Sequence, residues 1–170
     1  MSSINRSDVQ IAFVRGYRFH GSVDLKEVAS RLPQGIALCT PSLIAGEEHA
    51  KAVLTQAQEY WNRGLSLARN RSIDLLMRIS CRSQIELAIK MSSIESAKKI
   101  AMLGIADSTG IEDAEHRLSE NGGKRNDSVI SLHKGKEKFL RRTQEIPDSI
   151  NTDQFSSWLA EKSILLSLER

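Results

Sequence analysis

Aromatic residues, proline and cysteine are all scarce in this chain. Phenylalanine, tryptophan and tyrosine make up 5% of the 170 residues, and there are two cysteines and three prolines. So few aromatic side chains argue against an RNA-binding sheet that stacks bases on its face. Cys39 and Cys81 form no CxxC pair, which favours two small, reduced thiols, although the sequence leaves a disulfide between them open.

The chain also lacks a long apolar run. No stretch reaches the roughly 18 uninterrupted apolar residues that a membrane-spanning helix requires. The first ten residues, MSSINRSDVQ, contain no apolar segment typical of a secretory signal. Since 40% hydrophobic and 26% charged residues are ordinary values for a globular chain, we expect a soluble, cytoplasmic, single-domain protein over residues 1–170, with no contact to a membrane.

Recognisable catalytic motifs are missing as well. The sequence has no GxxxxGK[ST] phosphate loop, no GxGxxG, no GxSxG and no HExxH. Two clusters combine acidic residues with a histidine, at 47–49 and 112–116, but adjacent residues of a helix point in different directions. We therefore expect a non-catalytic protein with no cofactor and no metal. The alternative from another class is a small enzyme that uses His49 or Cys81.

Charge is sorted along the chain, although the net charge is only +3. Six basic residues face two acidic ones between Arg63 and Lys90, and seven face two between Lys124 and Arg142. The segment 107–120 between them is acidic. This sorting predicts a basic surface for an anionic partner; ordinary solvated helix faces are the alternative.

Short strands and amphipathic helices alternate in the residue pattern. Strands are predicted over Val9–Phe19, Ile36–Cys39 and Lys99–Ala106. We predict an α+β (mixed α/β) domain with a small, mostly antiparallel sheet packed against several helices, and a flexible loop over 121–127 (NGGKRND). Helices are expected over 23–32, 40–63, 72–80, 83–89, 109–118, 136–145 and 151–168.

Polar residues at the expected helix starts predict their caps. Thr40 precedes Pro41, Ser72 begins the third helix, and Thr109 with Glu112 matches a capping box. The apolar positions of the last helix are predicted to face inward: Phe155, Leu159, Leu165 and Leu168.

Charged residues recur every four positions from Asp74 through Arg78 and Arg82 to Glu86. On one continuous helix this spacing aligns several guanidinium groups, which suit phosphate because their planar fork donates two hydrogen bonds and stays charged. The alternative is a ladder of ion pairs on an exposed helix, between Asp74 and Arg78 and between Arg82 and Glu86. Arg71 has no such partner.

The run from Ser42 to Ile94 resembles the PRPK-binding protein family, the small subunit of the KEOPS tRNA-modification complex. Members carry an acidic–histidine pair, a long alanine-bearing helix and then a segment of the type E-I-L-x-x-x-x-G-x-R-Q-I-x-x-A-I. Here that segment reads SIDLLMRISCRSQIELAI. The closing AEKSILL resembles the family's final helix, of the type L-E-K-x-A-L-L.

The sequence departs from the family pattern at three positions. Cys81 stands where a glycine is usual, Ser83 lies between the arginine and the glutamine, and Ser93 replaces the glycine before Ile94. If those glycines allow a tight turn or a close approach of RNA, the substitutions bear directly on the binding site.

The resemblance implies an adaptor without chemistry of its own, with an atypical small kinase-ATPase and tRNA as partners. Threonylcarbamoyladenosine is made by a separate, metal-bearing catalytic subunit, which this chain would contact only indirectly. Archaeal-type members hold the single-stranded 3′ CCA end of tRNA. A regulatory subunit that binds only the kinase, without RNA, is the second hypothesis.

The resemblance and the basic charges together assign candidate residues to the two partners. Core packing of the last helix is the alternative to a kinase contact. The predicted tRNA-binding residues are Arg71, Arg78, Arg82, Gln84, Ile85 and Lys90. The predicted kinase-contact residues are Ile164, Leu165 and Leu168.

Overall fold

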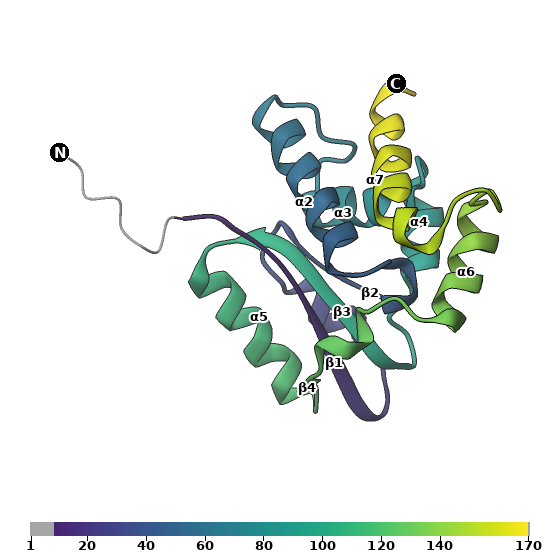
Figure 1. Cartoon of the computed structure of the whole chain (residues 1–170). Coiled ribbons are helices and arrows are strands. Elements are labelled where there is room, and N and C mark those ends of the chain that lie inside the picture. The colour runs from purple at the N-terminus through teal and green to yellow at the C-terminus, as the bar shows by residue number, and fades with distance from the viewer. Residues whose placement is uncertain (1–8, 170) are drawn as a thin grey trace.

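The computed structural model describes residues 9–169, in which a four-stranded sheet has helices on both faces (Figure 1). This arrangement confirms the predicted α+β class. The strands are β1 (Ile11–Val23), β2 (Ile36–Cys39), β3 (Ala97–Ala106) and β4 (Lys124–Arg125). The α-helices are α1 (Lys26–Ser30), α2 (Glu47–Asn62), α3 (Arg71–Ser80), α4 (Ile85–Ser92), α5 (Ser108–Glu120), α6 (Lys134–Gln144) and α7 (Phe155–Leu165). Short 3-10 turns are η2 (Pro41–Leu43), η3 (Asp127–Val129), η4 (Thr152–Gln154) and η5 (Leu166–Leu168).

The sheet is antiparallel, with the strand order β2-β3-β1-β4. Its centre is the long β1–β3 pair, whose register runs from Ile11 opposite Ala106 to Arg18 opposite Lys99. The short strand β2 pairs only with β3, so its outer edge is an edge of the sheet. That edge forms the floor of the candidate site.

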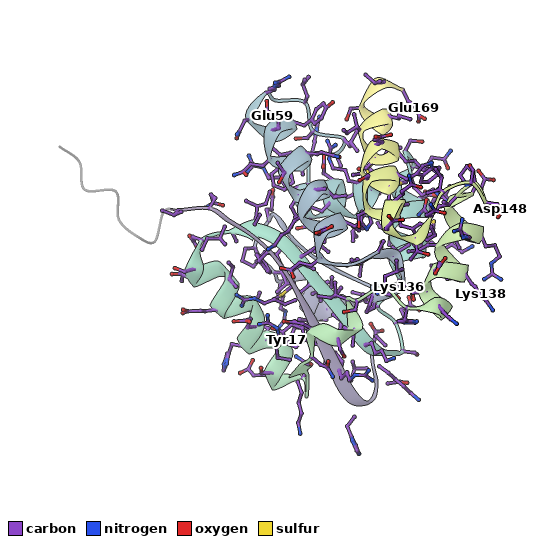
Figure 2. All side chains as sticks on the ribbon, viewed as in Figure 1. Tyr17, Glu59, Lys136, Lys138, Asp148 and Glu169 are labelled. Carbon is purple, nitrogen blue, oxygen red and sulfur yellow. The ribbon has the colours of Figure 1, made fainter. Side chains whose placement is uncertain are left out.

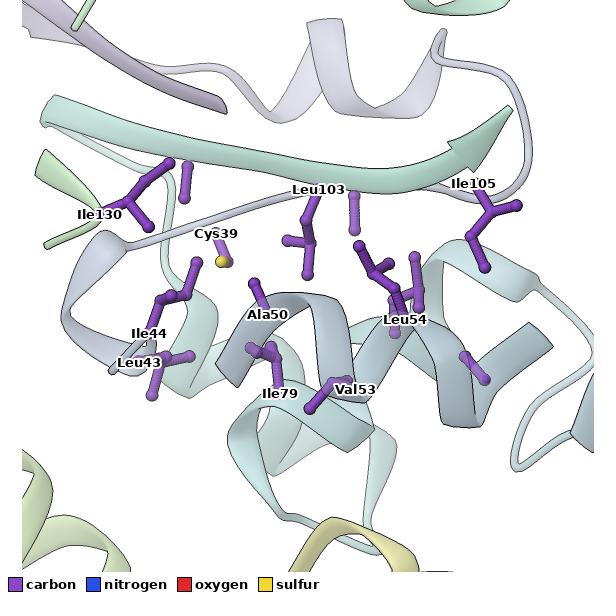
Figure 3. Close-up of a cluster of buried hydrophobic side chains, with 14 of the residues drawn as sticks. Cys39, Leu43, Ile44, Ala50, Val53, Leu54, Ile79, Leu103, Ile105 and Ile130 are labelled. Atoms are coloured by element: carbon purple, nitrogen blue, oxygen red, sulfur yellow. The ribbon is translucent and has the colours of Figure 1, made fainter. Parts of the chain in front are cut away.

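Alternate residues of β3 supply two separate cores, as the two-residue period of a strand requires. On one face, Leu103 and Ile105 point toward Val53 and Leu54 of α2 (Figure 3). On the other face, residues such as Met102 pack with side chains from α5 and from the start of α1. The sheet is therefore covered on both sides by helices and exposes little apolar surface of its own.

The helix predicted over 40–63 is in fact two elements. Thr40 caps as predicted, since its Oγ1 accepts from the Ser42 amide at 3.4 Å, and Pro41 begins η2. Ile44 is then extended, and Gly46 has a φ of 108°, a left-handed conformation that few residues other than glycine adopt. The prediction of one helix was wrong because the backbone conformation of Gly46 interrupts it, and α2 begins only at Glu47.

Two predicted caps each lie two residues too late in the sequence. Asn70 caps α3, with its side-chain oxygen accepting from the Ser72 amide at 2.9 Å. Asp107 caps α5 by accepting from the Gly110 amide at 2.7 Å. Ser72 and Thr109 are therefore inside their helices, because the side chains of Asn70 and Asp107 already accept from the first free amides.

The segment 121–127 is not structureless. It contains β4, which pairs with Tyr17 and Arg18 of β1. Asp127 accepts from the Gly16 amide at 2.9 Å and from Arg125 Nε at 2.7 Å. These contacts hold the segment against the sheet, while the flexibility predicted for it stays a prediction.

The prediction that Leu165 and Leu168 face inward was wrong. Phe155 and Leu159 are buried as expected, but Leu165 is 54% exposed and Leu168 is 71% exposed. Helical spacing puts Leu166, rather than Leu165, in line with the buried residues Phe155, Leu159 and Ser163, so Leu166 packs in the core instead. Two large apolar side chains are thereby left at the surface.

Candidate functional site

Arg78 is fully buried and cannot contact RNA, so its predicted role was wrong. Its Nε donates to Asp74 Oδ1 at 2.6 Å, and its guanidinium lies 4.9 Å from the centre of the Tyr60 ring. Its Nη1 also reaches Ser167 Oγ at 3.5 Å. The spacing of four residues indicated the Asp74–Arg78 ion pair correctly, but the pair lies inside the protein rather than on an exposed helix face.

The same ion pair joins three parts of the chain. Asp74 accepts from the amide of Leu67, which lies in the connection between α2 and α3. Arg78 contacts Tyr60 near the end of α2 and Ser167 in η5. The buried charge of Arg78 therefore holds these three parts of the fold together.

Arg71 and Arg82 are also engaged within the protein. The Arg71 guanidinium lies over the Trp61 ring, 5.0 Å from its centre. Arg82 Nη2 donates to the Thr143 carbonyl at 2.7 Å, and Nη1 donates to the Cys81 carbonyl at 3.1 Å and to Gln144 Oε1 at 3.4 Å. Arg82 thus satisfies groups at the carboxyl end of α6 rather than pairing with Glu86.

Cys81 occupies the turn at which the resembled family has glycine. It ends α3 with a φ of 52° and a ψ of 46°, the left-handed conformation that glycine adopts most easily. The turn is retained because the amides of Cys81 and Arg82 still bond to the last carbonyls of α3. Ser93, at the other departure, has a φ of −18° and needs no glycine.

A groove of about 490 Å³ lies along the outer edge of β2, between α1 on one side and α3 and α4 on the other. Its lining is largely apolar, with polar side chains among it. Apolar lining comes from Leu32, Ile36, Leu38, Ile73, Leu76, Ile89 and Ile94. Polar lining comes from Lys26, Gln34, Asn70, Ser72, Lys90, Ser92, Ser93 and Glu95.

The floor of this groove presents strand backbone. The Gly35 carbonyl accepts from the Ile105 amide at 2.8 Å, so alternation turns Ala37 toward β3 and turns Ile36 and Leu38 outward. The outward Ile36 amide donates a hydrogen bond to the Pro33 carbonyl. The Ile36 carbonyl and the Leu38 amide remain side by side on the groove edge, an acceptor next to a donor.

One of the six predicted tRNA-binding residues lines this groove. Lys90 lines it, and the exposed Ile85 lies one helical turn before Ile89, which also lines it. Gln84 is exposed at the start of α4. The groove could not be predicted from the sequence because its walls come from three separate segments, and because Ile73 and Ile89 have the spacing of ordinary core residues.

The predicted kinase-contact residues lie on exposed apolar surface around the end of α7. Ile164 lines a shallow cavity of about 410 Å³ against α2, and Leu165 lines another of about 330 Å³ with Trp158 and Lys162. Leu168 follows in η5 and is largely exposed. The chain thus offers an apolar surface here, as a protein contact requires.

His49 and the two cysteines are buried away from solvent. Burial is the main cause that lowers the pKa of His49 to about 4, and its Nδ1 accepts from the Ala45 amide at 3.0 Å. Burial likewise raises the thiol pKa to about 12 for Cys39 and to about 11 for Cys81. Both cysteines are free thiols, so the disulfide that the sequence left open is not formed. These groups are neutral and shielded, which does not favour the enzyme alternative.

No protein-family model and no curated protein matches the sequence. Within residues 9–169, no helix is long and apolar enough to cross a membrane. The same described residues contain no cluster of three or more histidine, cysteine or acidic side chains arranged to hold a metal ion.

We predict that Arg78→Ala lowers the free energy of unfolding by about 3–5 kcal/mol, because Asp74 would be left charged and unpaired in the interior. Urea denaturation measures this loss. Arg69→Ala, at an exposed arginine ahead of the same helix, is the matched control and should change stability by less than about 0.5 kcal/mol. A loss below about 1 kcal/mol for Arg78→Ala would show that the pair does not hold the fold.

The free energy of unfolding should also decrease as the pH falls, because of His49. Its pKa is about 4 in the folded protein, against an ordinary 6.5, so unfolding takes up a proton between these values. The contribution is complete above about pH 6.5 and is lost as pH falls toward 4, by about 3 kcal/mol in total. In His49→Asn, unfolding free energies measured across this range should decline less steeply; an unchanged slope would contradict the assignment.

Proposed function

We propose that this chain is the non-catalytic small subunit of a KEOPS-type tRNA-modification complex in the cytoplasm. In this role it binds the single-stranded 3′ CCA end of tRNA in the groove along β2, and it binds the kinase-ATPase through the surface around Leu165 and Leu168. Its contact with the catalytic subunit is indirect. The groove is the observation that carries the proposal.

The chemistry of the groove suits an unstacked nucleotide. Its volume of about 490 Å³ is within the range of about 300–1,000 Å³ typical of small-ligand sites. Ile73 and Ile89 offer apolar surface to the faces of a base, as expected where aromatic side chains are scarce. The Ile36 carbonyl and the Leu38 amide offer an acceptor and a donor to the edge of a base.

A positive charge stands beside this base-sized site. Lys90 lines the groove, is exposed and has no ion-pair partner within residues 9–169, so it is available to a phosphate. Lys26, on the opposite wall, is paired with Glu95. We therefore expect the phosphate contact on the α4 side of the groove.

The exposed leucines support the kinase part of the proposal. Soluble proteins seldom leave neighbouring large apolar side chains exposed without a partner. Leu165 and Leu168 are exposed around the end of α7, and the half-buried Ile164 precedes Leu165 in the sequence. A partner that covers this surface would bury all three.

A regulatory subunit that binds only the kinase is the second candidate. It is favoured by one observation, the internal use of Arg71, Arg78 and Arg82. The tRNA experiment that follows distinguishes it from the first candidate.

Removal of the terminal CCA should weaken tRNA binding to the whole chain at least about tenfold, a loss of about 1.4 kcal/mol. Fluorescence anisotropy with intact and trimmed tRNA measures the ratio. Ile89→Glu should bring the ratio near one, since a carboxylate in the groove repels the RNA. Leu87→Glu is the matched control, because Leu87 lies on the same helix with similar exposure, 42% against 48%, but does not line the groove.

Equal affinity for intact and trimmed tRNA would remove the CCA end from the proposal. Binding that is absent altogether, with the kinase contact retained, would establish the kinase-only candidate instead. An equal loss of affinity in Ile89→Glu and Leu87→Glu would place the contact on α4 as a whole rather than in the groove.

The double variant Leu165→Asp/Leu168→Asp should abolish co-purification with the kinase-ATPase from the same organism. The fold should be unaffected because both side chains are exposed. Val9→Asp, at an exposed apolar residue ahead of β1, is the control and should retain the kinase. Undiminished co-purification of the double variant would locate the kinase contact elsewhere.

A further inference from the structure

Three cations stand opposite one another on adjacent strands. Lys99 of β3 pairs in register with Arg18 of β1, and Arg18 pairs in turn with Lys124 of β4. Residues that are directly opposite in a sheet project to the same face. All three residues are exposed. We call Arg18, Lys99 and Lys124 the cation row.

The cation row has no counter-charge of its own. Within residues 9–169 none of its members forms an ion pair, whereas the exposed Arg31 and Arg63 each pair with a glutamate four positions earlier. The nearest acidic residue in the chain order of β4, Asp127, is occupied by Arg125 and by the Gly16 amide. Like charges placed opposite one another destabilise a sheet, so the arrangement costs stability that an anionic partner would restore.

A buried cation of helix α6, Lys136, lies close enough to Lys99 of the cation row to feel its charge. The buried Nζ of Lys136 donates to the carbonyls of Val129 and Ile130 at 3.0 and 2.8 Å. Burial is the main cause that lowers the pKa of Lys136 to about 8, and the positive charge of nearby Lys99 adds to this shift. Lys138 projects from the outer side of α6, whereas Lys136 lies on its inner side (Figure 2).

We propose that the cation row is a second RNA-contact surface, which takes the phosphate backbone of tRNA away from its 3′ end. The inference rests on the proposed function. Neighbouring strands are about 4.8 Å apart, so three long cationic side chains can follow successive phosphates across the sheet. The sheet order β2-β3-β1-β4 then puts the 3′ end at one edge and this backbone contact on the three remaining strands of the same molecule.

The surroundings of the cation row favour RNA over an anionic membrane. Membrane-surface proteins combine cations with apolar side chains that enter the lipid. The large exposed apolar residues of the described chain lie elsewhere, on α4, around the end of α7, at Leu65 and near Ile11 at the far end of β1. The cation row consists of charged side chains alone, which suit phosphates rather than bases. Its contact with RNA is therefore expected to be independent of the RNA sequence.

The test compares two triple variants that lose the same three positive charges. Arg18→Gln/Lys99→Gln/Lys124→Gln removes the row. Arg31→Gln/Lys51→Gln/Arg63→Gln is the control, because these exposed residues are each paired with a glutamate four positions earlier. Binding of intact and trimmed tRNA is measured between 50 and 200 mM salt, with thermal unfolding measured alongside.

The row variant should bind both intact and trimmed tRNA about tenfold more weakly. The slope of log affinity against log salt should fall by about 2–3, since each phosphate contact contributes about 0.7–0.9. The intact-to-trimmed ratio should be retained, and the unfolding temperature should not decrease because repulsion is relieved. The control variant should keep the wild-type slope.

An unchanged salt slope in the row variant, or an equal decrease in the control, would overturn the inference. So would row-dependent binding to phosphatidylserine vesicles without row-dependent binding to tRNA. Failure of the proposed function looks different, because wild-type protein would then bind intact and trimmed tRNA equally, whatever the row variant does.

Discussion

The buried ion pair between Asp74 and Arg78 is the interaction on which the arrangement of the helices depends. Each charge would be costly in the interior without the other. Together they bind the connection after α2, through Leu67, and the C-terminal turn, through Ser167, to one side of α3. The other side of α3 is left to line the groove, through Ile73. One internal interaction therefore positions both the groove wall and the end of the chain at which the exposed leucines lie.

The positive charges of the chain divide into those that build the fold and those that remain available. Arg78 and Arg82 satisfy groups inside the protein, and Arg71 lies over an aromatic ring. Lys90 and the cation row are exposed and have no acidic partner within residues 9–169. For a protein with a net charge of only +3, this distinction matters more than the number of basic residues. The proposed role in holding RNA rests on the second group.

Much of the fold could be predicted from local pattern, but the site could not. The bounds of β2 were predicted correctly because an unbroken apolar run of strand length is typical of a buried strand. The break at Gly46 was missed because Thr40 and Pro41 mark a helix start equally well for a short turn. Periodicity put Arg78 on a helix face, but it does not report how deeply that face is buried. The groove arises from α1, β2, α3 and α4 together, and only tertiary contacts bring them to one place.

The central claim is that the β2 groove holds the end of a single RNA strand. Nuclear magnetic resonance of the labelled chain, titrated with the trinucleotide CCA and separately with the dinucleotide CC, tests it most directly. Amide shifts at Leu38, Ile73, Ile89 and Lys90 are expected with CCA, and much smaller ones with CC. Shifts confined to the neighbourhood of Arg82, or none in the groove at saturating CCA, would contradict the claim.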